Sequence, residues 1–425
     1  MFAQHAERRA RLAAALYLTD EVLLISAGTP VPLPENSDQT YPFRAHAEFY
    51  YVTGTECAGA VVTFDPQDGP EAGWRLFTPE VTEDERIWQA RETIAGEPLA
   101  SLPAWLSARR TRPLALLGAS PPGVQADESV TARVREAFTH ARRAKDYWEL
   151  AIMQCAVEST AAGFAQVAAI LVPGVTERAL QVEIETAFLR HGATRPAFGT
   201  IVGAGPDSAV LHFEPTGRTL EEGDFVLIDA GAEIDRYVAD VTRTYVAGRP
   251  STFQRDVYEI VLGAQQRAIG RCVSGAEWRD VHLQCAVDMV AGLVSLGLMR
   301  GNAESLVEQQ AHQLFFPHGI GHLVGLGVRD ASGLLPGRAR TTRPDLKTLR
   351  LDLPLAPGYV VTVEPGLYFI PALLLDPQRR ERFRECVAWE KVEPHLGVGG
   401  VRIEDDVLVT GGPPEVLTAG IPKAL

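Results

Sequence analysis

The chain has 425 residues, of which 46% are hydrophobic and 22% are charged, and its formal net charge at pH 7 is −14. A chain of this length usually forms more than one hydrophobic core, so we expect two or three domains. The acidic balance argues against nucleic acid or an anionic membrane surface as a partner, and no apolar stretch is long enough to span a bilayer.

The first predicted element is a helix around residues 12–18, an apolar run that follows several arginines. Acidic residues close the run and no small-residue cleavage pattern follows, so we interpret it as part of a soluble domain rather than a signal peptide. The five cysteines are scattered and form no C-x-x-C pair, which favours a reducing compartment. We therefore expect a cytoplasmic protein.

The first third of the chain predicts a mixed α/β domain. Short apolar runs bounded by turn residues are typical of strands. They occupy residues 21–26, 59–64, 74–78 and 113–118. A basic helical stretch follows, and we place the domain boundary in it. This gives an N-terminal domain of residues 1–130 and a C-terminal domain of residues 131–425.

The rest of the chain alternates irregularly between helices and strands. Helical patterns cover residues 146–172 and then run from a cap at Thr176 to about Gly192, and two more lie between residues 253 and 298. Strand patterns occupy residues 200–203, 225–231, 236–246, 359–365 and 400–409. Hairpins among these strands predict an α+β fold rather than a doubly wound sheet.

Two aspartates, Asp229 and Asp240, lie on strands on either side of a polar turn. If the strands form a simple hairpin centred between Ile234 and Asp235, the two carboxylates face each other, with Cβ atoms about 5 Å apart. Carboxylates this close repel each other unless a cation lies between them. The alternative is a solvated hairpin in which both acids point outward.

Two glutamates occupy comparable strand contexts. Glu364 ends the run YVVTVEPG. Glu404 lies in GVRIEDDVLV, where strand alternation places it on one face with Arg402 and Asp406. An ion pair between Glu404 and Arg402 is the alternative to a metal-ligand role.

The segment FFPHGIGHLVGLGVRD supplies His318 and His322. Gly319 and Gly321 disfavour a regular helix and allow the backbone to approach a site closely. With the four carboxylates, His322 completes a ligand set suited to two hard or borderline divalent cations. His212, between an apolar run and a charged loop, is equally compatible with a core role and a site role.

Four blocks carry a resemblance to a known family: LIDAGAEIDRYVADVTRT, FPHGIGHLVGLGVRD, TVEPGLYF and GGVRIEDDVLVT. They resemble, in order, the signature blocks of the prolidase and aminopeptidase P group, metallopeptidases of the pita-bread fold. The match spans about residues 145–425, and the first third is more weakly similar to the N-terminal domain of the same group. The resemblance implies a smaller α/β N-terminal domain followed by an α+β pita-bread catalytic domain.

The resemblance also implies two divalent metal ions per subunit, with manganese preferred and cobalt or zinc as alternatives. By position, Asp229 would bind one ion, His322 and Glu364 would bind the other, and Asp240 and Glu404 would bridge both. A hydroxide bridging the ions would attack the scissile carbonyl, and Glu364 would pass a proton to the leaving nitrogen. The same resemblance implies a homodimer.

Three further residues match positions around that centre. His212 and His318 match positions that bind substrate and stabilise the tetrahedral intermediate. Arg402 matches an arginine that orients the metal ligands. All three are therefore expected to contribute to catalysis.

The chain departs from the group at two positions. Arg329 stands where a histidine is usual, and Phe198 stands where a tyrosine is common. Arginine keeps a positive donor but cannot act as a base. We expect Arg329 to recognise the substrate carboxylate, and Tyr368, also placed at the substrate, to supply the hydroxyl that Phe198 lacks.

The group hydrolyses the bond before proline, so proline-containing dipeptides and short peptides are the expected substrates. The long connection between Glu364 and Glu404 resembles that of prolidases and favours a Xaa-Pro dipeptidase. The N-terminal domain instead resembles that of aminopeptidase P, an enzyme of longer peptides, which is the alternative. A non-catalytic pita-bread binding module fits less well, because such modules normally lose ligands. Creatinases lack the metal set, and methionine aminopeptidases lack so large an N-terminal domain.

Overall fold

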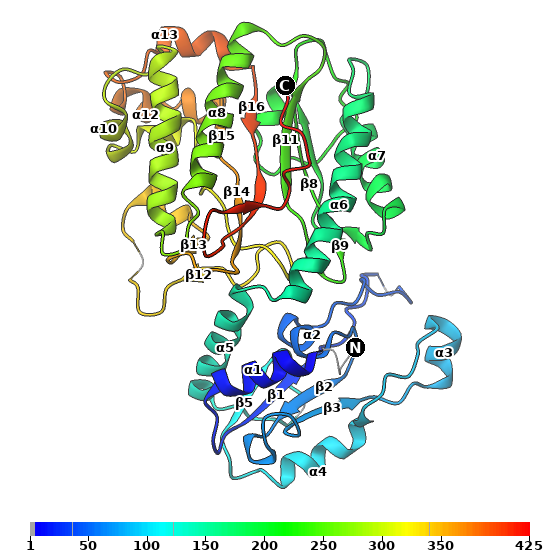
Figure 1. Cartoon of the computed structure of the whole chain (residues 1–425). Helices are drawn as coiled ribbons and strands as arrows, with labels where there is room; N and C mark the ends of the chain where they lie inside the picture. Colours follow the sequence, from blue (N-terminus) through cyan, green and yellow to red (C-terminus); the bar gives the residue numbers. More distant parts are fainter. Residues whose placement is uncertain (1–4, 36, 122, 340) are drawn as a thin grey trace. The chain divides into compact units, whose positions relative to one another are not determined.

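The computed structural model describes residues 5–35, 37–121, 123–339 and 341–425. The chain divides into two compact units, Met1–Arg142 and Arg143–Leu425 (Figure 1). A boundary after residue 130 would fall inside helix α5 (Glu128–Arg143), which the structure keeps almost whole within the first unit.

A mixed sheet in the strand order β4-β3-β2-β1-β5 forms the first unit. Its strands are β1 (Val22–Ser26), β2 (Val61–Phe64), β3 (Trp74–Thr78), β4 (Glu97–Pro98) and β5 (Leu114–Leu117). Its other helices are α1 (Ala6–Leu16), α2 (Ala47–Thr53), α3 (Glu83–Gln89) and α4 (Leu102–Ser107). The strands predicted from apolar runs are confirmed, whereas β4 is too short to show a pattern.

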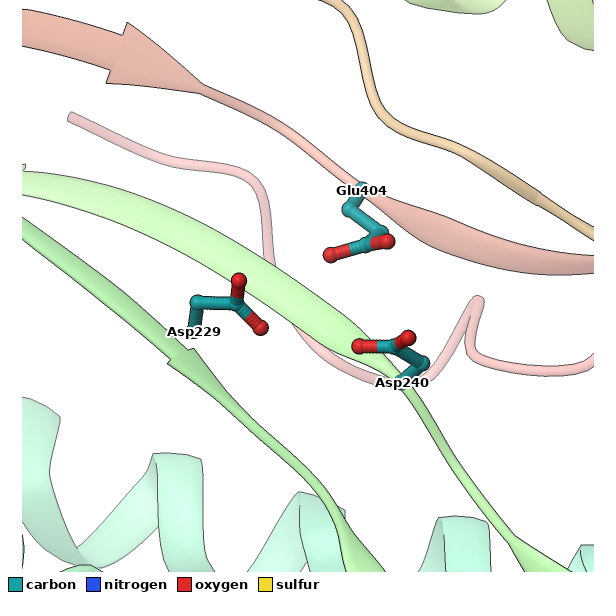
Figure 2. Close-up of side chains that lie close together, drawn as sticks. All are labelled: Asp229, Asp240 and Glu404. Carbon is teal, nitrogen blue, oxygen red and sulfur yellow. The ribbon is translucent and has the colours of Figure 1, made fainter. Parts of the chain in front are cut away.

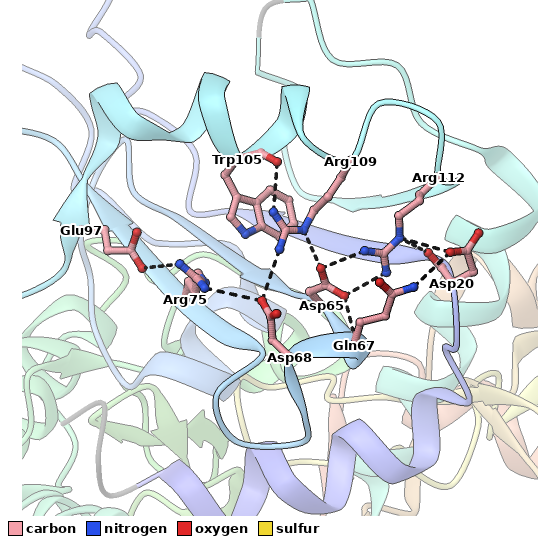
Figure 3. A network of polar contacts seen from close by, with 9 residues as sticks. All are labelled: Asp20, Asp65, Gln67, Asp68, Arg75, Glu97, Trp105, Arg109 and Arg112. Carbon is pink, nitrogen blue, oxygen red and sulfur yellow. Dashed lines mark hydrogen bonds and ion pairs between the residues drawn. The ribbon is translucent and has the colours of Figure 1, made fainter.

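A polar network fixes the end of β2 (Figure 3). Asp65, directly after this strand, is 1% exposed and accepts from Arg112 through both oxygens, at 2.8 and 2.9 Å. Arg109 Nε lies 2.5 Å from Asp65 Oδ2. Burial raises the pKa of Asp65, but hydrogen bonds from the two arginines outweigh burial and bring the pKa down to about 2. The first unit therefore neutralises its buried acid with its own cations.

Two helix pairs flank the strands of the second unit (Figure 1). On one side lie α6 (Tyr147–Ile170) and α7 (Glu177–Arg190), and on the other lie α8 (Thr252–Gly270) and α9 (Trp278–Ser295). Asp146 and Thr176 cap the first pair by accepting from backbone N–H groups in the first turn. The predicted helices are confirmed, and among the described residues no helix is both long and apolar enough to cross a membrane.

The remaining elements of the second unit are short. The helices are α10 (Ala303–Glu308), α11 (Pro371–Leu374), α12 (Pro377–Arg382) and α13 (Trp389–Val392). The strands are β6 (Arg195–Pro196), β7 (Ile201–Ala204), β8 (Phe225–Ala230), β9 (Ala232–Ile234), β10 (Tyr237–Val238), β11 (Val241–Val246), β12 (Gly333–Leu334), β13 (Leu351–Asp352), β14 (Val360–Val363), β15 (Gly366–Tyr368), β16 (Gly400–Arg402), β17 (Asp405–Leu408) and β18 (Glu415–Val416).

These strands form small sheets rather than one large one, in the orders β11-β8-β7, β10-β9-β6, β14-β17-β18, β15-β16 and β12-β13. One apolar core joins α6 and α7 to β7 and β8, and another joins α8 and α9 to β14, β16 and β17. The strands that carry the predicted metal ligands therefore rest on two separate cores.

Candidate metal centre

Asp229 and Asp240 lie on the hairpin that β8 and β9 form with β10 and β11, but they are not directly opposite each other. The ladder pairs Asp229 with Thr242, because the turn consists of Asp235 and Arg236, one position later than predicted. Both turn residues have positive φ angles, 46° and 73°, as a type I′ turn requires. The prediction of direct opposition is therefore wrong, and the two aspartates are diagonal neighbours across the hairpin.

Three carboxylates nevertheless converge beside this hairpin, and they face a common space (Figure 2). Asp229, Asp240 and Glu404 each offer an oxygen, and these atoms lie within 4.8 Å of one another. Asp240 and Glu404 are 4% and 2% exposed, so the solvated-hairpin alternative is wrong. Burial, and then repulsion from neighbouring acids, raises the pKa of both carboxyls well above their usual range.

His322 and Glu364 complete the cluster. His322 Nε2 lies 3.6 Å from Asp240 Oδ2 and 3.8 Å from Glu364 Oε1. Its Nδ1 lies 3.1 Å from the Leu323 carbonyl oxygen, which can only accept, so Nδ1 carries the proton and Nε2 presents a lone pair. Burial lowers the pKa of His322 to about 4 and raises that of Glu364 to about 7. A neutral imidazole therefore directs its lone pair at two carboxylates, which is unfavourable unless a cation lies between them.

The donor set fits the divalent ions that the resemblance implies. All five predicted ligands line the same cavity. Asp229 Oδ1 is buried and has no hydrogen-bond partner among the described residues, a costly state for a carboxylate oxygen that a bound cation would relieve. Carboxylate and imidazole donors are the ligands that manganese, cobalt and zinc accept.

Two glycines let the ligand-bearing segments come close together. A Cβ on Gly231 would lie 1.8 Å from the carbonyl oxygen of Ala239, and one on Gly321 would lie 2.0 Å from that of Thr362. His322 N donates to Thr362 Oγ1 at 3.0 Å, which fixes the histidine against β14. Larger residues at either glycine would force the strands apart and separate the ligands.

Arg402, which is 3% exposed, holds two of the ligands in place. Its Nη2 donates to Asp229 Oδ2 at 2.7 Å, and its Nε donates to Thr242 Oγ1 at 3.1 Å. The Thr242 hydroxyl in turn donates to Glu404 Oε2 at 2.6 Å. Arg402 therefore pairs with Asp229 rather than with Glu404, and it reaches Glu404 through the threonine.

Tyr368 connects Arg402 to His318. Arg402 Nη1 donates to the Tyr368 hydroxyl at 2.9 Å, and that hydroxyl lies 2.9 Å from His318 Nε2. His318 Nδ1 lies 2.8 Å from the Gly319 carbonyl oxygen, so Nδ1 donates there and Nε2 accepts from the tyrosine. Burial lowers the pKa of His318 to about 3, so the ring is neutral with both nitrogens engaged.

This chain of hydrogen bonds places two of the predicted residues. His318 lines the ligand cavity and accepts from the Tyr368 hydroxyl, and its part in catalysis stays a prediction. Tyr368 is 0% exposed and acts on the site through Arg402, which corrects the prediction that it contacts substrate. Tyr368 was also expected to supply the hydroxyl that Phe198 lacks. Its hydroxyl does belong to the network that supports Asp229, because Arg402 donates to both.

Two adjoining hollows, of about 420 and 690 Å³, share the ligands Asp229, His322 and Glu364 in their walls, and we call the pair the ligand cavity. His212 and Arg329 are exposed side chains on its wall, and Phe198 lines the larger hollow. The sequence interpretation missed two further wall residues, Lys347 and Arg350. The sequence feature that could have indicated them is a pair of cations in PDLKTLR, which follows the histidine segment in an acidic chain.

Comparison with known proteins identifies the family of this chain. Residues 151–411 match the model of metallopeptidase family M24, and residues 5–98 match that of the aminopeptidase P N-terminal domain. The chain belongs to metallopeptidase family M24. Membership confirms the predicted pita-bread catalytic domain with a smaller N-terminal domain, and it implies divalent metal ions at the centre described above.

Relatives of this M24 chain share both of its domains. It is 31% identical to a probable Xaa-Pro aminopeptidase of Coccidioides posadasii, over 96% of its own length and 92% of that protein. It is 30% identical to a probable Xaa-Pro aminopeptidase of Tuber melanosporum, over 94% and 89%. The structure is similar to aminopeptidase PepP of Pseudomonas aeruginosa, with a TM-score of 0.81, 28% identity and coverage of 100% and 96%. It is also similar to aminopeptidase P of E. coli with the inhibitor Pro-Leu, with a TM-score of 0.80, 27% identity and coverage of 99% and 96%.

Proposed function

We propose that this M24 metallopeptidase is a Xaa-Pro aminopeptidase, which removes the residue before proline from peptides longer than two residues. The observation that carries the proposal is the convergence of the five ligands in one cavity. The relatives named Xaa-Pro aminopeptidase, which match over nearly the whole chain, support this activity. The long connection between Glu364 and Glu404 favoured a dipeptidase in the sequence, and these relatives support the alternative instead.

The chain's own residues suit this reaction. Two divalent ions would be held by Asp229, Asp240, His322, Glu364 and Glu404, and when bound they activate water as the nucleophile and polarise the scissile carbonyl. Glu364 lines the cavity beside the other ligands, where a carboxylate can take up a proton and pass it on. It is therefore the residue suited to protonate the leaving proline nitrogen.

The larger hollow of the ligand cavity supports a preference for proline. Apolar side chains line it beside the ligands, namely Phe198, Ile201, Phe213 and Val328. The bond before proline is a tertiary amide without an N–H group, so a peptidase cannot recognise it through that donor. An apolar surface that accepts the pyrrolidine ring provides recognition in another way.

A Xaa-Pro dipeptidase is the second candidate, and Arg329 is the observation that favours it. This exposed guanidinium lies on the wall of the ligand cavity and forms no ion pair with a described residue. It could pair with a proline carboxylate, which in a dipeptide follows the scissile bond directly.

The deciding experiment compares hydrolysis of Ala-Pro with that of Ala-Pro-Ala, each with added manganese and with a chelator. We expect cleavage of the tripeptide, lost on chelation. Cleavage of the dipeptide alone would establish the second candidate. Cleavage of neither substrate by protein that holds stoichiometric metal would overturn both.

We also propose that manganese is the bound metal, that the protein is a homodimer and that it is cytoplasmic. Its free cysteines suit a reducing compartment. Elemental analysis of the purified protein, its mass in solution and its location in cells test these three statements.

A further inference from the structure

A separate cavity of about 460 Å³ lies beside the ligand cavity. Its wall includes Leu334, Leu346 and Leu349, so we call it the leucine cavity. Lys347 and Arg350 line both cavities. These two side chains therefore stand between the metal ligands and the leucine cavity, and a substrate at the ligands has that cavity as its neighbour.

The cations between the cavities differ from two others that the structure describes on the same segment. Arg338 donates to Glu277 and Asp352, and Arg343 donates to Asp345 at 2.8 Å. Lys347 and Arg350, by contrast, are exposed and form no ion pair with a residue that the structure describes. In a chain with a net charge of −14, two uncompensated cations at a cavity wall favour an anionic ligand.

The acid in the wall of the leucine cavity does not cancel this charge. Asp352 is 4% exposed and accepts from Arg279 Nε and Arg338 Nη1, each at 2.9 Å. Its charge is therefore balanced by two other arginines. What remains for a ligand is an apolar lining and two positive groups.

The segment that forms this wall is held in place. The side chain of Asp345, 1% exposed, accepts from the backbone N–H of Leu346 and from Arg343. Strand β12, which contains Leu334, pairs with β13 directly after Arg350. The leucines and the cations are therefore presented by a folded element.

We propose that the leucine cavity is a subsite for the residue that follows proline, and that it selects an apolar side chain bearing a free carboxylate. The leucines would take the side chain, and Lys347 and Arg350 would pair with the carboxylate. This inference rests on the proposed function, and it names the preferred substrates as tripeptides Xaa-Pro-Yaa in which Yaa is apolar. A dipeptide has no residue to place in the subsite, and a longer peptide presents a neutral amide where the tripeptide presents its charge.

The test measures kcat/KM of the manganese-loaded enzyme for Ala-Pro-Leu, Ala-Pro-Gly and Ala-Pro-Leu amide. We expect the leucine substrate to exceed the glycine substrate by about tenfold or more, because burial of such a side chain favours binding. We expect a similar loss for the amide, because it lacks the carboxylate. Equal rates for leucine and glycine would overturn the apolar subsite, and equal rates for acid and amide would overturn the role of the cations.

Variants connect these preferences to the cavity. Leu346→Ala should reduce the leucine preference, and Lys347→Met with Arg350→Met should remove the preference for acid over amide. Leu335→Ala, a neighbour outside the cavity wall, and Arg190→Met, an exposed cation on α7, are matched controls that should leave both ratios unchanged. Unchanged ratios in the cavity variants would overturn the assignment.

Failure of this inference can be told apart from failure of the proposed function. Cleavage of all the tripeptides without dependence on Yaa would leave the aminopeptidase activity intact and remove the subsite. Cleavage of the dipeptide alone, or of no substrate, would remove both. The unmodified enzyme answers the question through its substrates even if a variant does not fold.

Discussion

Asp65 in the first unit and Asp240 in the second are both buried, yet their charges are balanced in opposite ways. Asp65 accepts from Arg109 and Arg112, which hold its pKa near 2. Asp240 lies among other acids, and burial together with their repulsion raises its pKa. The chain supplies its own cations to Asp65, whereas the acids around Asp240 leave room for a cation from solution.

The largest effect that this comparison predicts is in Asp240→Asn. We expect kcat/KM to fall by about 10³ or more, because a metal ligand is lost. We also expect the melting temperature of the metal-free protein to rise by about 2–4 °C, because a repelling charge is removed. Full activity would contradict the ligand assignment, and a lower melting temperature in chelator would contradict the account of repulsion.

Asp65→Asn should have the opposite effect on stability. Removal of the acid's charge leaves two partly buried arginines without the carboxylate that they share, so the free energy of unfolding should fall by about 2 kcal/mol, with kcat/KM little changed. Urea unfolding followed by tryptophan fluorescence measures it. Glu97→Gln, which affects a half-exposed pair with Arg75, is the matched control and should cost under about 1 kcal/mol. Equal losses in the two variants would contradict the comparison.

Thr242→Val tests the hydroxyl between Arg402 and Glu404. We expect manganese affinity to weaken by about 10–100-fold, because the glutamate loses the donor that orients it. Isothermal titration calorimetry on metal-free protein gives the affinity. An unchanged affinity would show that Arg402 orients the ligands through Asp229 alone.

The two regions should also respond to pH in opposite directions. The pKa of Asp65 is lowered from 3.8 to about 2, so its contribution to stability is present above pH 3.8 and is lost as pH falls toward 2. The pKa of Glu364 is raised from 4.5 to about 7, mainly by burial, so the folded metal-free protein binds that proton more tightly than the unfolded chain does. Stability in chelator should therefore fall as pH rises from 4.5 to 7, and Glu364→Gln should flatten this slope. A slope unchanged in that variant would assign the effect to another group.

The four carboxylates could be proposed as ligands from the sequence because each lies in, or directly beside, an apolar strand whose pattern is local. His322 lies outside the strands, and its flanking glycines indicated it instead. The register of the hairpin could not be predicted in the same way. The turn residues Asp235 and Arg236 have positive φ angles, but no glycine marks the turn in the sequence. The polar residues alone therefore predicted a turn centre one residue too early. A one-residue error in the turn moves every cross-strand partner by two positions.

The hydrogen-bond network behind the ligands could not be predicted from the sequence either. Arg243 has the appearance of an ordinary polar residue on a strand, yet it is 1% exposed and donates to the carbonyl oxygens of Glu404 and Ile421 and to Asp405. Those partners lie far along the chain and depend on how the sheets pack. Lys347 and Arg350 were missed because the sequence does not show which arginines of the segment are paired. In the structure Arg338 and Arg343 take the nearby acids.

The ligand-bearing segments are joined through their backbones as well as through their side chains. Val238 N donates to the carbonyl oxygen of Gly325 at 3.1 Å, which ties the aspartate hairpin to the segment after His322, and Glu404 N donates to that of Thr242 at 3.1 Å. The amide hydrogens of Val238 and Glu404 should therefore exchange with solvent in one cooperative opening event rather than segment by segment. If so, no metal-ligating residue can move out of the site alone. The protein would then capture and release its metal ions through a subglobal opening, whose frequency hydrogen exchange measures.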